Sequence, residues 1–91
     1  MVKTNMSITI NYCPICGYKE FTPFDSKGYP TYDICPCCSF EAGNEYDHRS
    51  SSDDFERLRN IWVQDMKAEW WKKPAPKNWD YKKQISEMNK K

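Results

Sequence analysis

The first half of the chain alternates apolar and polar residues at the period of an extended strand. Residues 7–12 place isoleucine and tyrosine side chains on one face and serine, threonine and asparagine on the other. Residues 18–21 and 31–34 are two further short candidates, and the stretch 22–30 between them is rich in proline, glycine and other turn residues. This part of the chain therefore predicts a small sheet of three strands.

After residue 52 the apolar period changes to that of a helix. Aromatic and aliphatic residues recur at i, i+3, i+7 and i+11, on Phe55, Leu58, Trp62 and Met66. The stripe predicts an amphipathic helix over residues 53–72. Asp53 is expected to cap this helix with Glu56 as its capping-box partner, and Pro74 is expected to end it.

A second, shorter helix is predicted near the end of the chain. Residues 73–78 contain two prolines and predict a stiff connector. Residues 78–89 then place Ile85 and Met88 on one side of a closing helix. The predicted fold class is α+β, with residues 1–91 forming a single domain in which a small sheet precedes a long helix and a short one.

The length of the chain limits how such a fold is held together. A chain of 91 residues builds one domain with a limited core, and small domains often add disulfides or a metal. The chain contains no apolar signal core at its start and no run of membrane-spanning length. We therefore predict a cytoplasmic protein, in which closely spaced cysteines serve as metal ligands rather than as disulfides.

The cysteines themselves have the spacing of a metal site. Two Cys-x-x-Cys pairs occur with eighteen residues between them, which is typical of a four-thiolate centre. A gap of two residues lets one tight turn direct both sulfurs at one ion, and Gly17 and Ser39 stand where a positive φ is expected after each turn. Buried free thiols and a redox or disulfide role stay open as alternatives. We predict one structural zinc ion, with iron as the less favoured metal, on Cys13, Cys16, Cys35 and Cys38.

Two further residues with metal-binding side chains fall outside this pattern. Cys37 does not match the spacing of the first pair, so it is expected to point away from the ion as a small buried residue. A spare ligand or an oxidisable thiol is the alternative for Cys37. His48 is the single histidine and lies in a polar loop, where a surface position is expected because four thiolates already complete the shell.

The two cysteine turns resemble the knuckles of zinc ribbons and rubredoxins. More narrowly, the stretch 12–18, read as Tyr-Cys-Pro-x-Cys-Gly-Tyr, and the stretch 32–41, which contains Cys-Pro-Cys-Cys, resemble the bacterial cysteine-rich CPCC domain family. The resemblance covers about residues 12–41. It implies a structural metal, a three-stranded rubredoxin-like metal ribbon over residues 1–41, and no assigned enzymatic activity.

Aromatic residues and lysines gather near the end of the chain. Residues 72–91 carry seven lysines and two acids, a net +5, whereas residues 1–71 carry seven Lys/Arg and eleven Asp/Glu, a net −4. Trp62 and Trp70 lie on the helical stripe and are expected in the core. The remaining rings and their neighbouring cations predict a partner-binding surface. Its residues are Trp71, Lys72, Lys73, Lys77, Trp79 and Tyr81.

The function predicted from these features is non-enzymatic. The sequence contains no Ser/His/Asp set, phosphate loop or paired-carboxylate motif, and four protein thiolates leave no open metal position for water. We predict a zinc-stabilised module that binds another protein, one form of which is an immunity- or inhibitor-type partner of a bacterial protein. A small-molecule substrate and a membrane are not expected as partners.

Three other interpretations stay open. The basic, aromatic segment at the end could stack bases and pair with phosphates, although the total charge of only +1 and the acidic first part oppose binding to a nucleic acid. A rubredoxin-like electron carrier would need iron in place of zinc. The plainest alternative is a charged, solvated tail that binds nothing.

Overall fold

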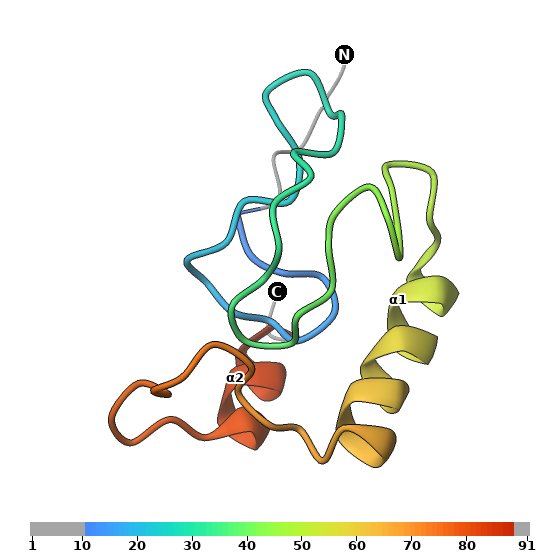
Figure 1. Cartoon of the computed structure of the whole chain (residues 1–91). Helices are drawn as coiled ribbons and strands as arrows, with labels where there is room; N and C mark the ends of the chain where they lie inside the picture. Colours follow the sequence, from blue (N-terminus) through green and yellow to red (C-terminus); the bar gives the residue numbers. More distant parts are fainter. Residues whose placement is uncertain (1–10, 89–91) are drawn as a thin grey trace.

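Loops and tight turns form the part of the protein that precedes the first helix. The computed structural model describes residues 11–88. Helix α1 spans Ser52–Asn60 and continues directly into a π-helix, η2, at Ile61–Asp65, and helix α2 spans Tyr81–Met88. Figure 1 shows α1 running beside these loops and α2 lying near the cysteine turns, so the turns lie between the helices and the rest of the loops.

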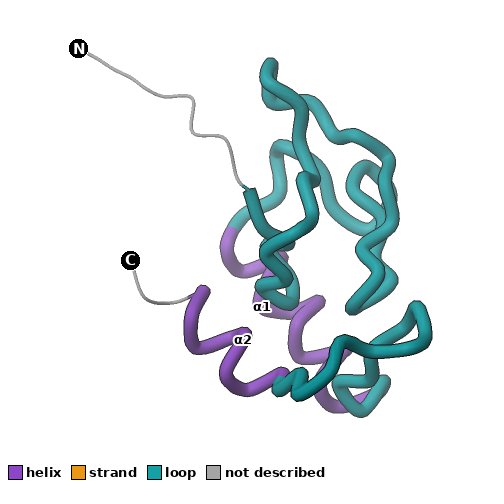
Figure 2. The backbone as a smooth tube through the Cα atoms, turned by 90° about the vertical axis from the view of Figure 1, so that its left-hand side faces the viewer, coloured by secondary structure: helices purple, strands orange, loops and turns teal. Residues whose placement is uncertain are grey.

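The predicted three-stranded sheet is not formed within residues 11–88, so the α+β zinc-ribbon fold class is wrong for this part of the chain. Figure 2 shows helices and loops without a strand there. Residues 18–21 form no bridge, and residues 31–34 contribute one residue to an isolated bridge. The strand predicted over 7–12 lies outside the described residues except for its last two positions, which are not in a strand. The isolated bridges join Phe24 to Pro30, Ile34 to Glu41 and Ala42 to Tyr46.

The backbone between the two cysteine turns explains why these bridges do not extend into strands. Tyr32 has a φ of 63°, in the left-handed region, so the segment that alternates in sequence is not extended at this point. Pro23 and Pro30 have no N–H to donate to a ladder. The alternation of residues 31–34 also does not mark a buried face, because Ile34 is 46% exposed.

The N-cap of helix α1 is Ser51, two residues before the predicted cap Asp53, and the helix begins at Ser52. The Ser51 hydroxyl accepts a hydrogen bond from the Asp54 N–H at 3.3 Å, and the Asp54 carboxylate accepts one from the Ser51 N–H at 2.9 Å. This capping box replaces the predicted one, in which Glu56 was the partner. The Ser51 N–H lowers the pKa of Asp54, because the hydrogen bond favours the charged carboxylate.

We expect Ser51→Ala to lower the free energy of unfolding by about 0.5–1 kcal/mol, because the Asp54 N–H then loses its acceptor. Ser52→Ala is the matched control, since Ser52 is the first residue of α1 itself and is not the N-cap. Urea unfolding of the metal-saturated protein, followed by circular dichroism, measures both. Equal effects of the two substitutions would contradict the capping assignment.

The long helix ends at Asp65, well before the predicted end at residue 72, so Pro74 does not terminate it. The last turn widens, with the Met66 N–H donating to the Ile61 carbonyl at 3.1 Å. Lys67 and Ala68 then adopt positive φ values of 61° and 51°, which reverse the chain. The apolar repeat of the sequence continues past this point because residues after the chain reversal are also buried in the same core.

The core is built from aromatic rings around the cysteine turns, and Trp62 and Trp70 are buried in it, as predicted. Tyr18 lies edge-on to Trp70 with ring centroids 5.1 Å apart, and Trp70 in turn lies 5.3 Å from Trp79. Trp62 is fully buried and contacts the rings of Trp79 and Tyr81 at 6.3 Å and 6.0 Å. These contacts link the first cysteine turn, the start of η2 and helix α2 into one cluster.

Helix α2 occupies the middle of the range 78–89 in which a closing helix was predicted. Its first turn follows Asp80, whose carboxylate accepts the Lys82 N–H at 3.0 Å. Ile85 packs against the core cluster from this helix. None of the helices within residues 11–88 combines the length and the apolar character needed to cross a membrane.

Candidate metal centre

The first cysteine turn is a tight loop closed by its own backbone. The Gly17 N–H donates to the Cys13 carbonyl at 2.8 Å, and the Cys13 N–H donates to the Tyr18 carbonyl at 2.9 Å. Gly17 has a φ of 87°, as the sequence predicted, and a Cβ built there would lie 3.0 Å from the Gln84 carbonyl oxygen. Glycine is therefore required both by the backbone conformation and by the close approach of α2.

The second cysteine turn repeats this arrangement. The Ser39 N–H donates to the Cys35 carbonyl at 2.9 Å, and the Cys35 N–H donates to the Phe40 carbonyl at 3.1 Å. Ser39 has a φ of 71°, in the place that Gly17 takes in the first turn, as predicted. The equal spacing in sequence thus gives two turns with the same backbone pattern, each presenting two sulfurs.

The two turns bring four sulfur atoms together. All four lie within 4.8 Å of one another and all four residues are fully buried; they are Cys13, Cys16, Cys35 and Cys38. The Sγ atoms of Cys13 and Cys38 are 3.7 Å apart, and so are those of Cys16 and Cys35. A regular tetrahedron with metal–sulfur bonds of about 2.3 Å has edges of about 3.8 Å. The four cysteines could therefore hold a metal ion with little movement.

The same distances exclude a disulfide between these sulfurs in this structure. A disulfide joins its sulfurs at about 2.05 Å, and the cysteines of the described chain are free thiols. The donor set also fits a metal, because thiolates favour zinc and other soft or borderline ions.

Burial and hydrogen bonding change the pKa values of the clustered thiols. Burial raises the pKa of Cys16, with hydrogen bonds that the Cys16 thiol donates to neighbouring sulfurs adding to the effect, and it also raises the pKa of Cys38. The pKa of Cys35 is lowered, chiefly because the Cys13 thiol donates to its sulfur. Cys16 and Cys38 therefore favour the protonated thiol, whereas Cys35 favours the thiolate. A divalent ion would release those protons on binding, since metal ligation requires thiolates.

Helix α1 holds the first turn through Arg59, a residue that the sequence pattern did not single out. Its Nε donates to the Ile15 carbonyl at 2.6 Å and its Nη2 to the Pro14 carbonyl at 2.8 Å. Both acceptors lie between the two cysteines of the turn and belong to buried residues. The guanidinium suits this role because its fixed fork of donors can satisfy two carbonyls at once. The only signal in the sequence was a charged residue between the apolar positions of the stripe.

We expect Arg59→Met to lower the free energy of unfolding by about 2–3 kcal/mol, because it leaves two buried carbonyls without charged donors. Arg57→Met is the matched control, since the Arg57 side chain is 63% exposed and pairs with Asp54 only at 3.7 Å. Denaturant unfolding of the metal-saturated proteins measures the difference. If the two variants are equally stable, Arg59 does not hold the turn.

Helix α2 holds the same turn from another direction through Gln84. Its Nε2 donates to the Cys16 carbonyl at 2.9 Å and approaches the Cys37 sulfur at 3.5 Å. Its Oε1 accepts the indole N–H of Trp79 at 2.9 Å. No sequence motif marks Gln84, because its role depends on how α2 returns to the turn. The candidate centre is therefore held between two helices.

Cys37 and His48 do not belong to the group of four sulfurs. Cys37 is fully buried beside it, and its thiol contributes to raising the pKa of Cys16. It is a small buried residue, as predicted, and the Gln84 amide nitrogen lies 3.5 Å from its sulfur. His48 is exposed, and its ring lies edge-on to Tyr29 with centroids 5.4 Å apart.

A buried hydroxyl lies in the neighbouring core. The Tyr46 hydroxyl is the one buried side-chain nitrogen or oxygen of residues 11–88 that has no hydrogen-bond partner. Burial raises the pKa of Tyr46, and the charge of the cysteines, Cys13 first, raises it further. The phenol is therefore neutral, and its ring packs edge-on against Phe24 and Phe55.

The predicted partner-binding residues separate into two groups. Trp79 and Tyr81 are half-buried, and their rings contact Trp62, so part of each ring is covered within the fold. Trp71 is 51% exposed. The three predicted lysines are also exposed; they are Lys72, Lys73 and Lys77.

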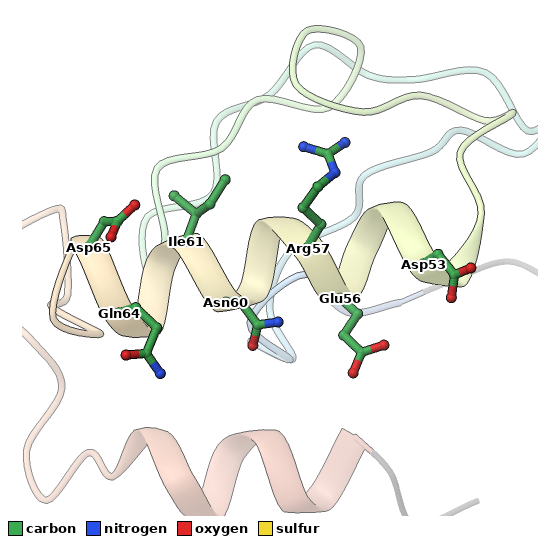
Figure 3. A pocket seen from close by; sticks show the side chains of 7 residues that line it. All are labelled: Asp53, Glu56, Arg57, Asn60, Ile61, Gln64 and Asp65. Carbon is green, nitrogen blue, oxygen red and sulfur yellow. The ribbon is translucent and has the colours of Figure 1, made fainter.

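The surface of helix α1 carries an open hollow that lies apart from the cysteines. Its volume is about 500 Å³, and Figure 3 shows that its seven lining side chains all come from the single helical stretch between Asp53 and Asp65. They include carboxylates, amides and Arg57 around the one apolar residue Ile61. This mixture of charges gives the hollow the character of a solvated helix face.

Two proteins of Bacillus subtilis (strain 168) share part of this sequence. The chain is 50% identical to the uncharacterized protein YozI over 40 residues and 46% identical to the uncharacterized protein YoaQ over 39 residues. Each match covers 40% of this chain and 33% of the relative, so the chain spans about a third of the length of these curated relatives. No family model matches the chain, and no solved structure does. Membership of the CPCC domain family therefore stays a prediction.

Proposed function

We propose that this chain is a non-enzymatic, zinc-stabilised module that binds another protein. The observation that carries the proposal is the convergence of four fully buried cysteine sulfurs within 4.8 Å of one another. Four protein thiolates fill a tetrahedral shell, so a bound ion keeps no open position for water or substrate. Such an ion would serve to fasten the two cysteine turns together.

Zinc is the metal we propose, because closed four-thiolate sites in small domains favour it. Iron fits the same sulfur geometry, and an iron centre would make the protein an electron carrier instead. Elemental analysis of the protein purified from its own host, combined with its visible spectrum, tests the assignment. We expect one equivalent of zinc and a colourless protein. A red protein with one equivalent of iron would contradict the proposal in favour of electron transfer.

The finer form of the proposal is an immunity- or inhibitor-type partner of a bacterial protein. Exposed Trp71 and the exposed lysines around it support a role in binding, because tryptophan is a frequent anchor of interfaces. Native mass measurement of the complex isolated from the host cell tests this form. A stable complex with one protein is the expected result, and a free monomer at cellular concentration would contradict it.

A further inference from the structure

The backbone of Trp71 is hydrogen-bonded to the second cysteine turn, whereas its side chain is largely exposed to solvent. The Trp71 N–H donates to the Cys37 carbonyl at 2.9 Å, and the Lys72 N–H donates to the Pro36 carbonyl at 2.9 Å. The preceding residue, Trp70, is only 5% exposed, whereas Trp71 is 51% exposed. The second cysteine turn therefore fixes the backbone of a residue whose large ring is half exposed. A rigid, exposed aromatic is what an interface anchor requires.

The surroundings of this ring have the composition of an interface. Trp71 borders a shallow recess of about 350 Å³ with Met66 and Trp70 as its apolar part. Lys67 and Lys73 also line it, together with two acidic residues. One of these acids is already paired, because Lys73 Nζ lies 2.9 Å from the Glu69 carboxylate. Protein interfaces likewise combine aromatic and methionine side chains with charged residues.

Charge distinguishes this end of the molecule from the rest. Residues 66–83 contain six lysines and two acids, a net +4, whereas residues 11–65 contain five Lys/Arg and ten Asp/Glu, a net −5. Within the described chain, Lys67 and Lys72 form no ion pair. Cations that are unpaired in the folded protein favour an acidic partner, and the opposite charge elsewhere orients that partner toward this end.

The burial of the other rings favours a protein over a nucleic acid. Proteins that bind single strands stack successive bases on several exposed rings. Trp70 is buried, and the rings of Trp79 and Tyr81 pack against Trp62, so Trp71 is the one ring of residues 66–83 that is largely exposed. A long polyanion would also meet the acidic remainder of the molecule. A short acidic segment with one apolar side chain avoids both difficulties.

We infer that Trp71 and the lysines beside it, Lys67, Lys72 and Lys73, form the docking surface for an acidic segment of a partner protein. The apolar side chain of that segment packs on the Trp71 ring, and its carboxylates lie against the ammonium groups of Lys67 and Lys72, which form no ion pair within the described chain. This inference rests on the proposed function, because it names the surface and the partner class of the same interaction module.

The test uses the metal-loaded full chain and a library of random peptides displayed on phage. Selected peptides are synthesised and titrated by fluorescence anisotropy against three proteins: the parent, a Trp71→Ala/Lys72→Gln variant, and a Tyr29→Ala/Lys27→Gln control. Tyr29 is 57% exposed and Lys27 is exposed, so the control removes a ring and a cation from another surface. Metal content and thermal unfolding of both variants are measured first. A 12-nucleotide single-stranded RNA is titrated in parallel.

We expect the selected peptides to carry a net negative charge and one large apolar residue. The Trp71→Ala/Lys72→Gln variant should bind them roughly 10-fold to 100-fold more weakly, and the control should bind like the parent. Selected peptides that bind equally to both variants would overturn the docking surface but leave the interaction module standing. A library that yields no binder contradicts both. RNA that binds more tightly than the peptides, or a parent dimer that the Trp71 variant abolishes, would assign the surface to a different occupant and overturn the inference.

Discussion

Cys35→Ser is expected to abolish metal binding and to unfold the chain. The substitution removes one of the four sulfurs that converge in the buried cluster. Structural zinc contributes apparent binding energies on the order of 10 kcal/mol or more in small domains, which is comparable to the whole stability of a typical domain, about 5–15 kcal/mol. Far-ultraviolet circular dichroism, tryptophan fluorescence and zinc stoichiometry measure the loss. Chelation of the ion from the parent protein should produce the same spectra.

Cys37→Ala is the matched control for this experiment. Cys37 is also fully buried, two residues from Cys35, but its sulfur is not one of the four. This variant should bind one zinc ion and unfold cooperatively, with a loss of about 1–2 kcal/mol from its shortened side chain. If Cys35→Ser retains one equivalent of zinc and the melting temperature of the parent, the metal is not what holds the turns together.

The unfolding caused by Cys35→Ser should extend beyond the cysteine turns. The sequence alone shows no contacts between the cysteine turns and the helices. Arg59 from α1 and Gln84 from α2 both bind carbonyls of the first turn. Helical signal at 222 nm should therefore fall together with tryptophan fluorescence, as one transition.

The candidate site could be predicted from the sequence because its geometry is local. A gap of two residues fixes how one turn presents two sulfurs, and the same gap repeats at the second turn. The positive φ of Gly17 and Ser39 is local in the same sense. Arg59 and Gln84 could not be predicted, because their partners are 44 and 68 residues away along the chain.

The sequence predicted a sheet that is not formed within residues 11–88, because a strand depends on a partner strand as well as on its own sequence. Residues 31–34 alternate in sequence, but a single left-handed residue, Tyr32, changes which side chains face the core. The predicted length of the long helix was wrong for a related reason. Trp70 fits the periodic stripe and is buried, yet it reaches the core after the chain has reversed at Lys67 and Ala68. The apolar repeat in the sequence indicates which side chains are buried, but it does not determine the path of the backbone.

Trp62→Ala is expected to be the most damaging substitution outside the cysteines. Trp62 is fully buried, and its indole N–H donates to the Glu69 carbonyl at 3.2 Å across the reversal. Large-to-small changes at such positions cost about 3–5 kcal/mol, through lost burial and the cavity that remains. For a chain of this size that corresponds to a fall of more than about 10 °C in melting temperature.

Trp71→Ala makes the same chemical change at a ring that is 51% exposed, and it separates the core role from the surface role. It should alter the free energy of unfolding by no more than about 0.5 kcal/mol, because its backbone donor to Cys37 is retained. Thermal and urea unfolding of both zinc-loaded variants decide between the roles. Equal destabilisation would mean that Trp71 belongs to the core, and an anchor for a partner would then have to be sought on another surface. A large loss for Trp62→Ala alone would leave the Trp71 ring free for binding, since the fold would not depend on it.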